Sequence, residues 1–291
     1  MAVRDRRRTI LITGGTDGVG RQTAADLAQH PDNYVIIHGR TKESCEKTIE
    51  LIRKEGARYD NIDYIAVDFT SLKAVTTAVE EIKTRYPAIS CVVCNASTVQ
   101  QRRHETMDGF ESTFQVNFLA HFLFLNRLLP LLEQNTPSRI IVIGSTLHSW
   151  TAIDWQDLQA GADFEKYLQF SRTKLMCHMM AFALHRRMAL TGFKVTVNVM
   201  DLGRERRETN NNYRFRCASA LSTSESVFSV GRSAGGLVQV VESPALNTMS
   251  GKYLDCHGKQ LRSGADATNE RLQERLWAEA TKLCANYLLN S

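Results

Sequence analysis

The sequence predicts an α/β fold in which a doubly wound parallel sheet of about seven strands is flanked by helices. Short runs rich in β-branched residues alternate along the chain with longer segments of helical apolar spacing. Parallel neighbours in a sheet need crossover connections, and these longer segments can supply them as helices. The 291 residues, 43% of them hydrophobic, show no repeat and no linker-like change of composition, so we expect a single domain over residues 1–291.

The expected strands are short and end at small or polar residues. They lie at residues 9–13, 34–38, 64–67, 89–93, 140–143, 194–199 and 252–254. Helices are expected after the first strand and at residues 43–54, 72–86, 109–132, 164–190, 232–241 and 269–287. The last of these forms the core of a C-terminal helix expected over residues 265–291. Thr70 or Ser71 would cap the helix at residues 72–86. Residues 203–230 are polar with little periodicity, and we expect them to form a substrate loop.

A glycine-rich turn separates the first strand from the first helix. Glycines allow a tight turn and a close approach of backbone to a ligand. The free N–H groups and the dipole of the helix N-terminus then face an anion. This context predicts a dinucleotide site formed by Gly14, Thr16, Asp17, Gly18, Val19 and Gly20. An ordinary glycine-rich β–α turn is the alternative.

Several polar or small residues follow directly after the expected strands. In a doubly wound sheet, ligands bind at the carboxyl ends of the strands, beside the point where the strand order reverses. We therefore expect one edge of the sheet to hold the site, with contributions from Gly14, Arg40, Asp68, Asn95, Ser145 and Leu202.

Composition excludes several classes of partner. The net charge of +5 is modest, and we find no basic stripe with interleaved aromatic residues, so nucleic acid is not expected as a partner. No apolar run reaches membrane-spanning length and no signal-peptide core precedes Thr9, so we expect a cytoplasmic protein without a membrane span. Cys91 and Cys94 point to opposite faces of an apolar strand, which favours buried free thiols over a redox pair.

With these positions established, the chain resembles the short-chain dehydrogenase/reductase superfamily, a group with a Rossmann-type fold, and its retinol-dehydrogenase-like branch. Thr13-Gly14 followed by Gly18-Val19-Gly20 is similar to the cofactor turn of that family. The resemblance implies cofactor contacts from Asp68, Phe69, Asn95, Ala96, Leu202 and Gly203, and a catalytic group of Asn117, Ser145 and Lys174. In this group Ser145 would hydrogen-bond the reacting oxygen and Lys174 would hold the nicotinamide ribose. Asn117 would keep a water chain in register with Lys174.

Arg40 bears on which nicotinamide cofactor is used. An acidic residue at the end of the second strand accepts hydrogen bonds from the 2′-hydroxyl of NAD, whereas an arginine suits the 2′-phosphate of NADP. Here Gly39-Arg40 ends the strand without an acidic residue. The sequence therefore predicts NADP(H). The alternative is an exposed arginine on a loop.

Phe170 is the main departure from the family pattern. The resemblance implies a tyrosine four residues before Lys174 as the general acid/base, and phenylalanine has no proton to give. Either Phe170 belongs to a natural change in chemistry, or it replaces a tyrosine in an impaired site. The other departures are Ser97 in the Asn-Ala-Gly segment and Leu202 in the Pro-Gly segment, and both leave backbone contacts available.

Residues on the loops at this edge are candidates for the substrate pocket, because such loops carry specificity. They are His148, Trp150, Trp155, Tyr167 and Tyr213. His148 could transfer a proton or only shape the pocket. Tyr167 could reach the site, although packing or solvent exposure is favoured. His178 and His185 share a helix face but have no third ligand, so no metal is expected.

These observations favour an NADP(H)-dependent oxidoreductase that reduces a carbonyl or imine/iminium group of a small organic molecule. An isomerase or cyclase that uses the same pocket is the first alternative. A catalytically impaired variant or a non-catalytic binding protein is the second. The helices from Gly109 and Phe164 resemble those that form dimer faces in this superfamily, which suggests a homo-oligomer.

Overall fold

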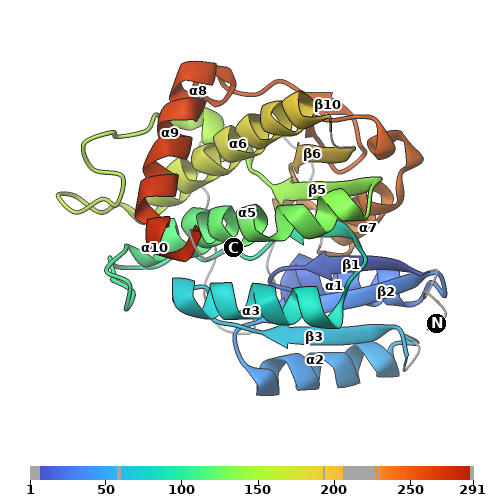
Figure 1. Ribbon diagram of the computed structural model, residues 1–291. Helices are drawn as coiled ribbons and strands as arrows, with labels where there is room; N and C mark the ends of the chain where they lie inside the picture. The colour runs from blue at the N-terminus through green and yellow to red at the C-terminus, as the bar shows by residue number, and fades with distance from the viewer. Residues whose placement is uncertain (1–6, 58–59, 193, 206–226, 229, 289–291) are drawn as a thin grey trace.

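A twisted sheet runs through the centre of the molecule with helices on both faces (Figure 1). The computed structural model describes residues 7–57, 60–192, 194–205, 227–228 and 230–288. The strand order is β10-β9-β6-β5-β4-β1-β2-β3. All neighbouring pairs are parallel except β10 with β9. The expected fold class is therefore confirmed, and β10 is an additional edge strand that the sequence did not predict.

The strands of this sheet begin and end close to their expected positions. They are β1 Arg8–Ile12, β2 Asn33–Gly39, β3 Ile62–Ala66, β4 Ile89–Cys94, β5 Ser138–Ile143, β6 Val195–Met200, β9 Tyr253–Leu254 and β10 Gln260–Leu261. A separate short pairing joins β7 Arg204–Glu205 to β8 Val227–Phe228. This pairing is not predicted by the sequence, and most of the expected substrate loop lies outside the described residues.

The strand order reverses between β1 and β4. β1 pairs with β2 on one side and with β4 on the other, so the chain leaves β3 at the edge of the sheet and returns to its centre. The turn after β1 therefore lies at the switch point, where this type of sheet places its ligands.

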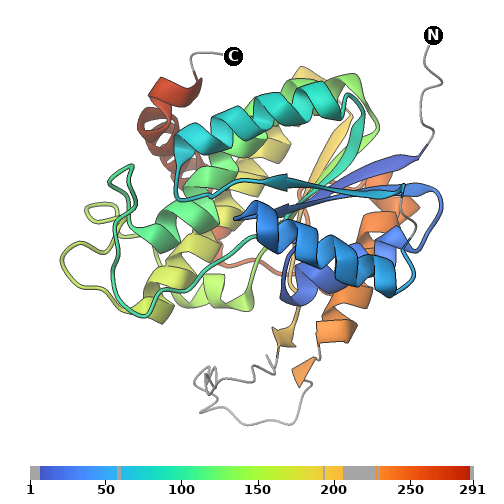
Figure 2. The same ribbon diagram turned by 90° about the horizontal axis from the view of Figure 1, so that it is seen from below.

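Two helical layers enclose the sheet (Figure 2). One contains α3 Leu72–Arg85, α5 Ala120–Gln134 and α6 Lys166–Thr191, and the other contains α1 Gly18–Ala28, α2 Lys42–Lys54 and α7 Val230–Glu242. Cys94 is buried with the first layer and Cys91 with the second, which confirms their opposite orientations. The six described cysteines are all buried and free, and Cys217 lies outside the described residues.

The helix expected from Gly109 begins later and is not uniform. Gly109 has a φ of +79°, a left-handed conformation that cannot continue a helix, so the helix begins after it. The buried Glu111 carboxylate is the cap, because it accepts the N–H groups of Thr113 and Phe114. The run then consists of α4 Ser112–Phe114, a π-helical segment η1 Gln115–Leu119 and α5. The wider π turn contains Asn117. Such turns often occur at functional sites.

The C-terminal segment is divided where one helix was expected. It forms α8 Ala265–Thr268, α9 Glu270–Leu283 and α10 Ala285–Leu288, with Asn269 capping α9. α9 packs on α6 and α10 packs on α5 (Figure 1). Trp277 meets Phe122 of α5 edge to face, with ring centroids 4.8 Å apart. The face that we expected to be available for dimerisation is thus partly covered by the chain itself.

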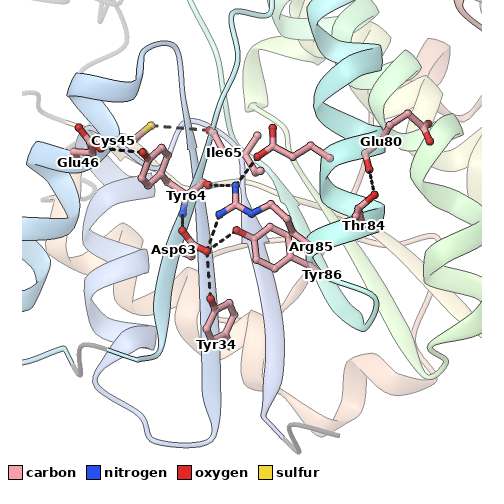
Figure 3. Close-up of polar contacts among 11 residues, drawn as sticks. Tyr34, Cys45, Glu46, Asp63, Tyr64, Ile65, Glu80, Thr84, Arg85 and Tyr86 are labelled. Atoms are coloured by element: carbon pink, nitrogen blue, oxygen red, sulfur yellow. Dashed lines mark hydrogen bonds and ion pairs between the residues drawn. The ribbon is translucent and has the colours of Figure 1, made fainter. Parts of the chain in front are cut away.

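A polar cluster fastens the edge strand β3 to its neighbours (Figure 3). The Asp63 carboxylate accepts hydrogen bonds from Arg85 at 2.8 Å, Tyr86 at 2.8 Å and Tyr34 at 3.4 Å. Burial raises the pKa of the Tyr86 phenol, and the neighbouring Asp63 raises it further. Ser71, whose hydroxyl accepts the Ala74 N–H, is the cap of α3. The Asp63 cluster lies at the amino ends of β2 and β3, away from the carboxyl ends of the strands, and has a structural role.

No helix in the described part of the chain is long and apolar enough to cross a membrane.

Candidate functional site

The glycine turn closes against neighbouring backbone at distances that leave no room for a side chain. A Cβ on Gly14 would lie 2.8 Å from Ala96 Cα, and a Cβ on Gly20 would lie 2.2 Å from the Gly14 carbonyl oxygen. The Asp17 carboxylate accepts the Gly18 N–H at 2.7 Å and caps α1. The first turn of α1 thus presents N–H groups without intrahelical partners at the sheet edge, where a phosphate could bind. The Val19 side chain is buried in the core instead.

His38 contacts this turn directly, and Phe69 packs against His38. His38 Nδ1 accepts the Gly14 N–H at 3.1 Å, and its Nε2 lies 2.8 Å from the Val67 carbonyl oxygen. The ring stacks on Phe69 at a centroid distance of 4.3 Å. Burial lowers the pKa of His38 to about 4, so the ring is neutral near pH 7. Phe69, assigned to the cofactor by resemblance, has a buried side chain.

Arg40 and Asp68 stand at the outer part of the same edge. Both are exposed, and the Arg40 side chain makes no ion pair or hydrogen bond with another described residue. A Cβ on Gly39 would lie 2.4 Å from Thr16 Cγ2, so the residue before Arg40 packs directly against the glycine turn. The chain thus brings Arg40 next to the predicted phosphate site.

Asn95 joins the end of β4 to the end of β1. Its Nδ2 donates to the carbonyl oxygens of Thr13 at 2.9 Å and Gly14 at 3.1 Å. The Thr13 hydroxyl accepts the backbone N–H groups of Asn95 and Ala96, both at 2.9 Å. The residues predicted to line the cofactor at the centre of the edge therefore lie together.

A hydrogen-bond chain leads from this turn to Asn117. The Thr13 hydroxyl and His121 Nε2 are 2.9 Å apart, and His121 Nδ1 lies 3.1 Å from the Asn117 carbonyl oxygen. Because a carbonyl only accepts, Nδ1 carries the hydrogen, and Nε2 accepts the Thr13 hydroxyl. Burial lowers the pKa of His121 to about 3, which keeps this ring neutral too.

Ser145 lies two residues after β5 and is the N-cap of a short 3₁₀ turn, η2 Thr146–Trp150. Its hydroxyl accepts the Leu147 N–H at 3.2 Å, which leaves the hydroxyl hydrogen available to a ligand. His148 Nδ1 is 2.6 Å from the Ser145 carbonyl oxygen, and His148 Nε2 accepts the Gly264 N–H at 3.0 Å. Both ring nitrogens of His148 are therefore engaged, and the ring shapes the loop. Burial lowers its pKa.

Lys174 and Phe170 lie on α6, which packs against η2, the turn that follows Ser145. The Lys174 ammonium donates to the Ile143 carbonyl oxygen at 2.9 Å and lies 5.5 Å from the centre of the Phe170 ring. Lys174 is 5% exposed, so the charge is held in a largely desolvated position. Asn117 donates from Nδ2 to the Thr173 hydroxyl at 3.1 Å, one residue before Lys174. Asn117, Ser145, Phe170 and Lys174 thus gather around the end of β5.

The loop after β6 is folded by Asp201. Its Oδ1 accepts the Gly203 N–H at 2.7 Å, and its Oδ2 accepts the Tyr253 hydroxyl at 2.7 Å. The Leu202 carbonyl oxygen accepts the Ser233 hydroxyl at 2.7 Å. Gly203 has a φ of +78°, a conformation that suits glycine.

The remaining pocket candidates occupy different surroundings. Trp150 is 65% exposed, and Trp155 is half-buried beneath the Arg275 guanidinium, 4.2 Å from its ring centre. Tyr167 is half-buried beside the Lys166 ammonium, and Tyr213 lies outside the described residues. Trp155 is therefore fixed to the C-terminal helix, which the sequence did not predict. No group of three metal-ligating side chains occurs in the described ranges.

Sequence reasoning missed His38, His121 and Cys177. Cys177 Sγ donates to the Asn117 carbonyl oxygen at 3.2 Å. His121 stands four residues after Asn117, a helical spacing that places both on one face and could have revealed the contact. The role of Cys177 depends on how α6 packs against the π turn, for which the sequence carries no comparable signal.

Comparison with known proteins identifies the family to which the chain belongs. The family described as short chain dehydrogenase covers residues 8–214. Retinol dehydrogenase 13 of Homo sapiens is 31% identical over 283 residues, which are 95% of this chain and 84% of that protein. Polyprenol dehydrogenase of Homo sapiens is 27% identical over 282 residues, with the same two coverages.

Solved structures share the fold at lower sequence identity. A carbonyl reductase from chicken fatty liver, bound to NADPH, has a TM-score of 0.66 at 18% identity, covering 89% of this chain and 100% of that chain. An uncharacterised protein from Mycobacterium Paratuberculosis has a TM-score of 0.74 at 20% identity, covering 96% of this chain and 93% of that chain.

Proposed function

The chain belongs to the short-chain dehydrogenase family, in its retinol-dehydrogenase-like branch, and we propose that it is an NADP(H)-dependent oxidoreductase acting on a carbonyl or imine/iminium group of a small organic molecule. One observation carries the proposal. The ends of β1, β4 and β5 bring the glycine turn, Asn95 and Ser145 to one edge of the sheet, where the Lys174 ammonium donates to the Ile143 carbonyl oxygen. This edge suits a dinucleotide next to a reacting group.

The residues at this edge fit a dinucleotide. At Gly14 and Gly20 a Cβ would collide with the protein's own atoms, so these glycines allow the turn to close beside the helix N-terminus that would bind the pyrophosphate. The exposed Arg40, which follows the Gly39 that packs against Thr16, supports NADP(H) over NAD(H), because its guanidinium can pair with a 2′-phosphate. When bound, the nicotinamide supplies a hydride.

Ser145 and Lys174 are the groups proposed to act on the substrate. The Ser145 hydroxyl accepts Leu147 N–H and can donate its own hydrogen to the reacting oxygen. The Lys174 ammonium adds positive potential at the end of β5, which favours negative charge on that oxygen. The same positive charge opposes a cationic substrate nearby. These two groups therefore favour a carbonyl.

Phe170 supports an imine or iminium substrate as the second candidate. Hydride transfer to a ketone or aldehyde leaves an alkoxide that needs a proton, and Phe170 cannot donate one. Hydride transfer to an iminium carbon gives a neutral amine without a proton. An aromatic ring face also attracts cations, although Lys174 already lies over this ring.

Incubation with NADPH tests the proposal. We expect oxidation of NADPH with aldehydes and ketones, or with cyclic iminium ions, followed as loss of absorbance, and slower oxidation of NADH. Conversion of a substrate without NADPH oxidation would indicate an isomerase or cyclase. Binding of NADPH without conversion of any substrate would indicate a binding protein, and absence of NADPH binding would refute the cofactor assignment.

A further inference from the structure

His38 joins the glycine turn to the ends of two strands. Its Nδ1 accepts the Gly14 N–H at 3.1 Å, and its Nε2 lies 2.8 Å from the carbonyl oxygen of Val67, the residue directly after β3. Because a carbonyl only accepts, the ring hydrogen is on Nε2. The main-chain carbonyl oxygen of His38 also accepts the Gly15 N–H at 2.8 Å. His38 is 3% exposed, so its ring is buried among these partners.

The end of β2 contacts the turn at three successive residues. A Cβ on Gly15 would lie 2.8 Å from Ile37 Cβ, and a Cβ on Gly39 would lie 2.4 Å from Thr16 Cγ2. Between these two close approaches lies His38. The contacts at Ile37 and Gly39 are steric and only limit how near the turn can come. The His38 ring supplies a directed hydrogen bond, which fixes an orientation as well as a distance.

Gly14 depends on hydrogen bonds for its conformation. It has a φ of +65°, and glycine adopts this and many other conformations at little cost. Two side chains from the strands on either side of β1 hold it. Asn95 Nδ2 donates to its carbonyl oxygen at 3.1 Å, and the His38 ring accepts its N–H. Without the ring, this part-buried N–H would lose its acceptor, which favours a rearranged turn.

The two strand ends that His38 joins to the turn carry the residues assigned to the adenosine part of the cofactor. Arg40 lies two residues after His38. Asp68 directly follows Val67. We propose that His38 sets the spacing between the phosphate site at the glycine turn and the adenosine site at Arg40 and Asp68, so that one nucleotide reaches both. This inference rests on the proposed function. His38 is a positioning residue, since its buried ring acts through the turn.

Two adenosine phosphates separate these sites in a binding experiment. Adenosine 2′-phosphate can occupy only the adenosine site, whereas adenosine 2′,5′-bisphosphate also carries the phosphate that would extend to the glycine turn. The ratio of their dissociation constants measures how much the 5′-phosphate adds to binding. A change in this ratio therefore reports the spacing between the two sites. A general loosening of the fold would weaken both ligands by similar factors.

Three substitutions of His38 alter its two hydrogen bonds separately. His38→Leu removes both, His38→Asn keeps an acceptor near the position of Nδ1, and His38→Gln places its amide near the position of Nε2. We expect the ratio to fall about tenfold in the leucine and glutamine variants, which is the effect of one hydrogen bond left unmade. In the asparagine variant it should stay within about threefold of the unmodified protein. Affinity for adenosine 2′-phosphate should be the same in all of them.

Two further measurements need no ligand. In isotope-labelled protein, the NMR shifts of the His38 ring should show the hydrogen on Nε2 near pH 7, because burial lowers its pKa to about 4 and keeps the ring neutral. Exchange of the Gly14 amide hydrogen with solvent should be slow in the unmodified protein and in His38→Asn. It should be faster in the leucine and glutamine variants, which lack the acceptor.

Several results would overturn the inference. They are an unchanged ratio in the leucine and glutamine variants, an equal loss in the asparagine variant, equal weakening of both ligands, a hydrogen on Nδ1, and Gly14 exchange that is the same in every variant. If His38→Leu does not fold, the asparagine and glutamine variants decide the question, since they carry the same amide at different reach. Failure of the unmodified protein to bind both NADPH and the bisphosphate, measured by calorimetry, would instead refute the proposed function together with this inference.

Discussion

Two regions of the candidate site are built differently. At the ends of β1, β2 and β4, close backbone contacts and histidines with both ring nitrogens hydrogen-bonded fix the position of the strand ends. At the ends of β5 and β6, the proposed site depends on individual side chains. In the first region Gly20 has no room for a Cβ, and His121 uses both ring nitrogens. In the second, His178 stacks on His148 with centroids 3.7 Å apart, and neither nitrogen of His178 bonds to a described residue.

This difference indicates which part of the candidate site can accept substitutions without loss of the fold. The glycine turn is closed by contacts among many atoms. A substitution in this turn therefore disturbs several contacts at once. The chemistry proposed at the end of β5 depends on single groups, such as the hydroxyl that Phe170 lacks. If the proposed function holds, a chain of this kind can keep the proposed cofactor edge and alter its reaction by one or two substitutions.

Gly20→Ala should have the largest effect. The new Cβ would meet the Gly14 carbonyl and Asn95 Nδ2, both of which help to close the turn. We expect at least a 10²-fold loss of NADPH affinity, about 2.7 kcal/mol, by titration calorimetry. Gly235→Ala is the matched control, since Gly235 also lies in a helix but has no atom within 4 Å of its Cβ position. Equal NADPH affinities in the Gly20→Ala and Gly235→Ala variants would contradict the view that close packing of the glycine turn is needed to bind NADPH.

A pair of histidine substitutions compares the two regions directly. His121→Leu should lower the free energy of unfolding at pH 7 by about 1–3 kcal/mol, because Thr13 and Asn117 each lose a partner. His178→Leu should leave it unchanged or raise it, since no hydrogen bond within the described residues is lost. Urea unfolding of both variants measures this. A larger loss in His178→Leu would contradict the comparison.

The same two variants have a defined dependence on pH. Burial lowers the pKa of His121 to about 3 and that of His178 well below its usual value. As pH falls below about 6.5, the unfolded chain gains protons that the folded chain does not, so stability decreases by about 1.4 kcal/mol per pH unit for each such histidine. Each leucine variant should therefore lose less stability than the unmodified protein between pH 6.5 and pH 5. The exposed His30→Gln serves as a control.

The sequence predicted most of the sheet because strands and crossovers follow from apolar periodicity and glycine positions. It missed β10 and the division of the C-terminal segment, where short elements depend on contacts with distant residues. The start of the helix at Ser112 was misplaced because Glu111, a charged residue, is buried as its cap. Its interior π turn depends on how α5 packs and has no local signal.

The site was predicted as a set of positions and not as a set of contacts. Strand-end spacing located Asn95 and Ser145, since parallel strands bring their carboxyl ends together. It could not indicate that Trp155 packs under Arg275, or that Cys177 reaches the Asn117 carbonyl. Those contacts join elements far apart in the sequence and depend on side-chain rotamers.

Lys174→Ala tests whether the second region still positions a cofactor. We expect NADPH affinity to fall about tenfold, or 1.4 kcal/mol, and any reductase activity to fall with it. The Ile143 carbonyl would also lose its partner, which should reduce the free energy of unfolding by about 1–3 kcal/mol. The exposed helical Lys73→Ala should change stability by about 0.5 kcal/mol or less and leave NADPH affinity unaltered. Unaltered NADPH binding in Lys174→Ala would make Lys174 a purely structural residue.

Arg40 should affect only the choice between the two cofactors and not the stability of the fold, because its guanidinium is exposed to solvent. We expect the unmodified protein to bind NADPH at least tenfold more tightly than NADH, a difference of about 1.4 kcal/mol, from one charge-assisted contact to the 2′-phosphate. Arg40→Asp should shrink or reverse this preference, since a carboxylate repels a phosphate and can accept a hydrogen bond from the 2′-hydroxyl of NADH.

Lys42→Asp is the control that separates a contact from a general change of charge. It alters the net charge by the same amount two residues later, where Lys42 pairs with Glu46 at 3.7 Å. If Arg40 meets the 2′-phosphate directly, only Arg40→Asp should change the ratio of the NADPH and NADH dissociation constants. Equal shifts from both substitutions would mean that the field around the edge, rather than Arg40, selects the cofactor. Equal dissociation constants in the unmodified protein would refute the NADP(H) assignment and leave the glycine turn as a site for either nucleotide.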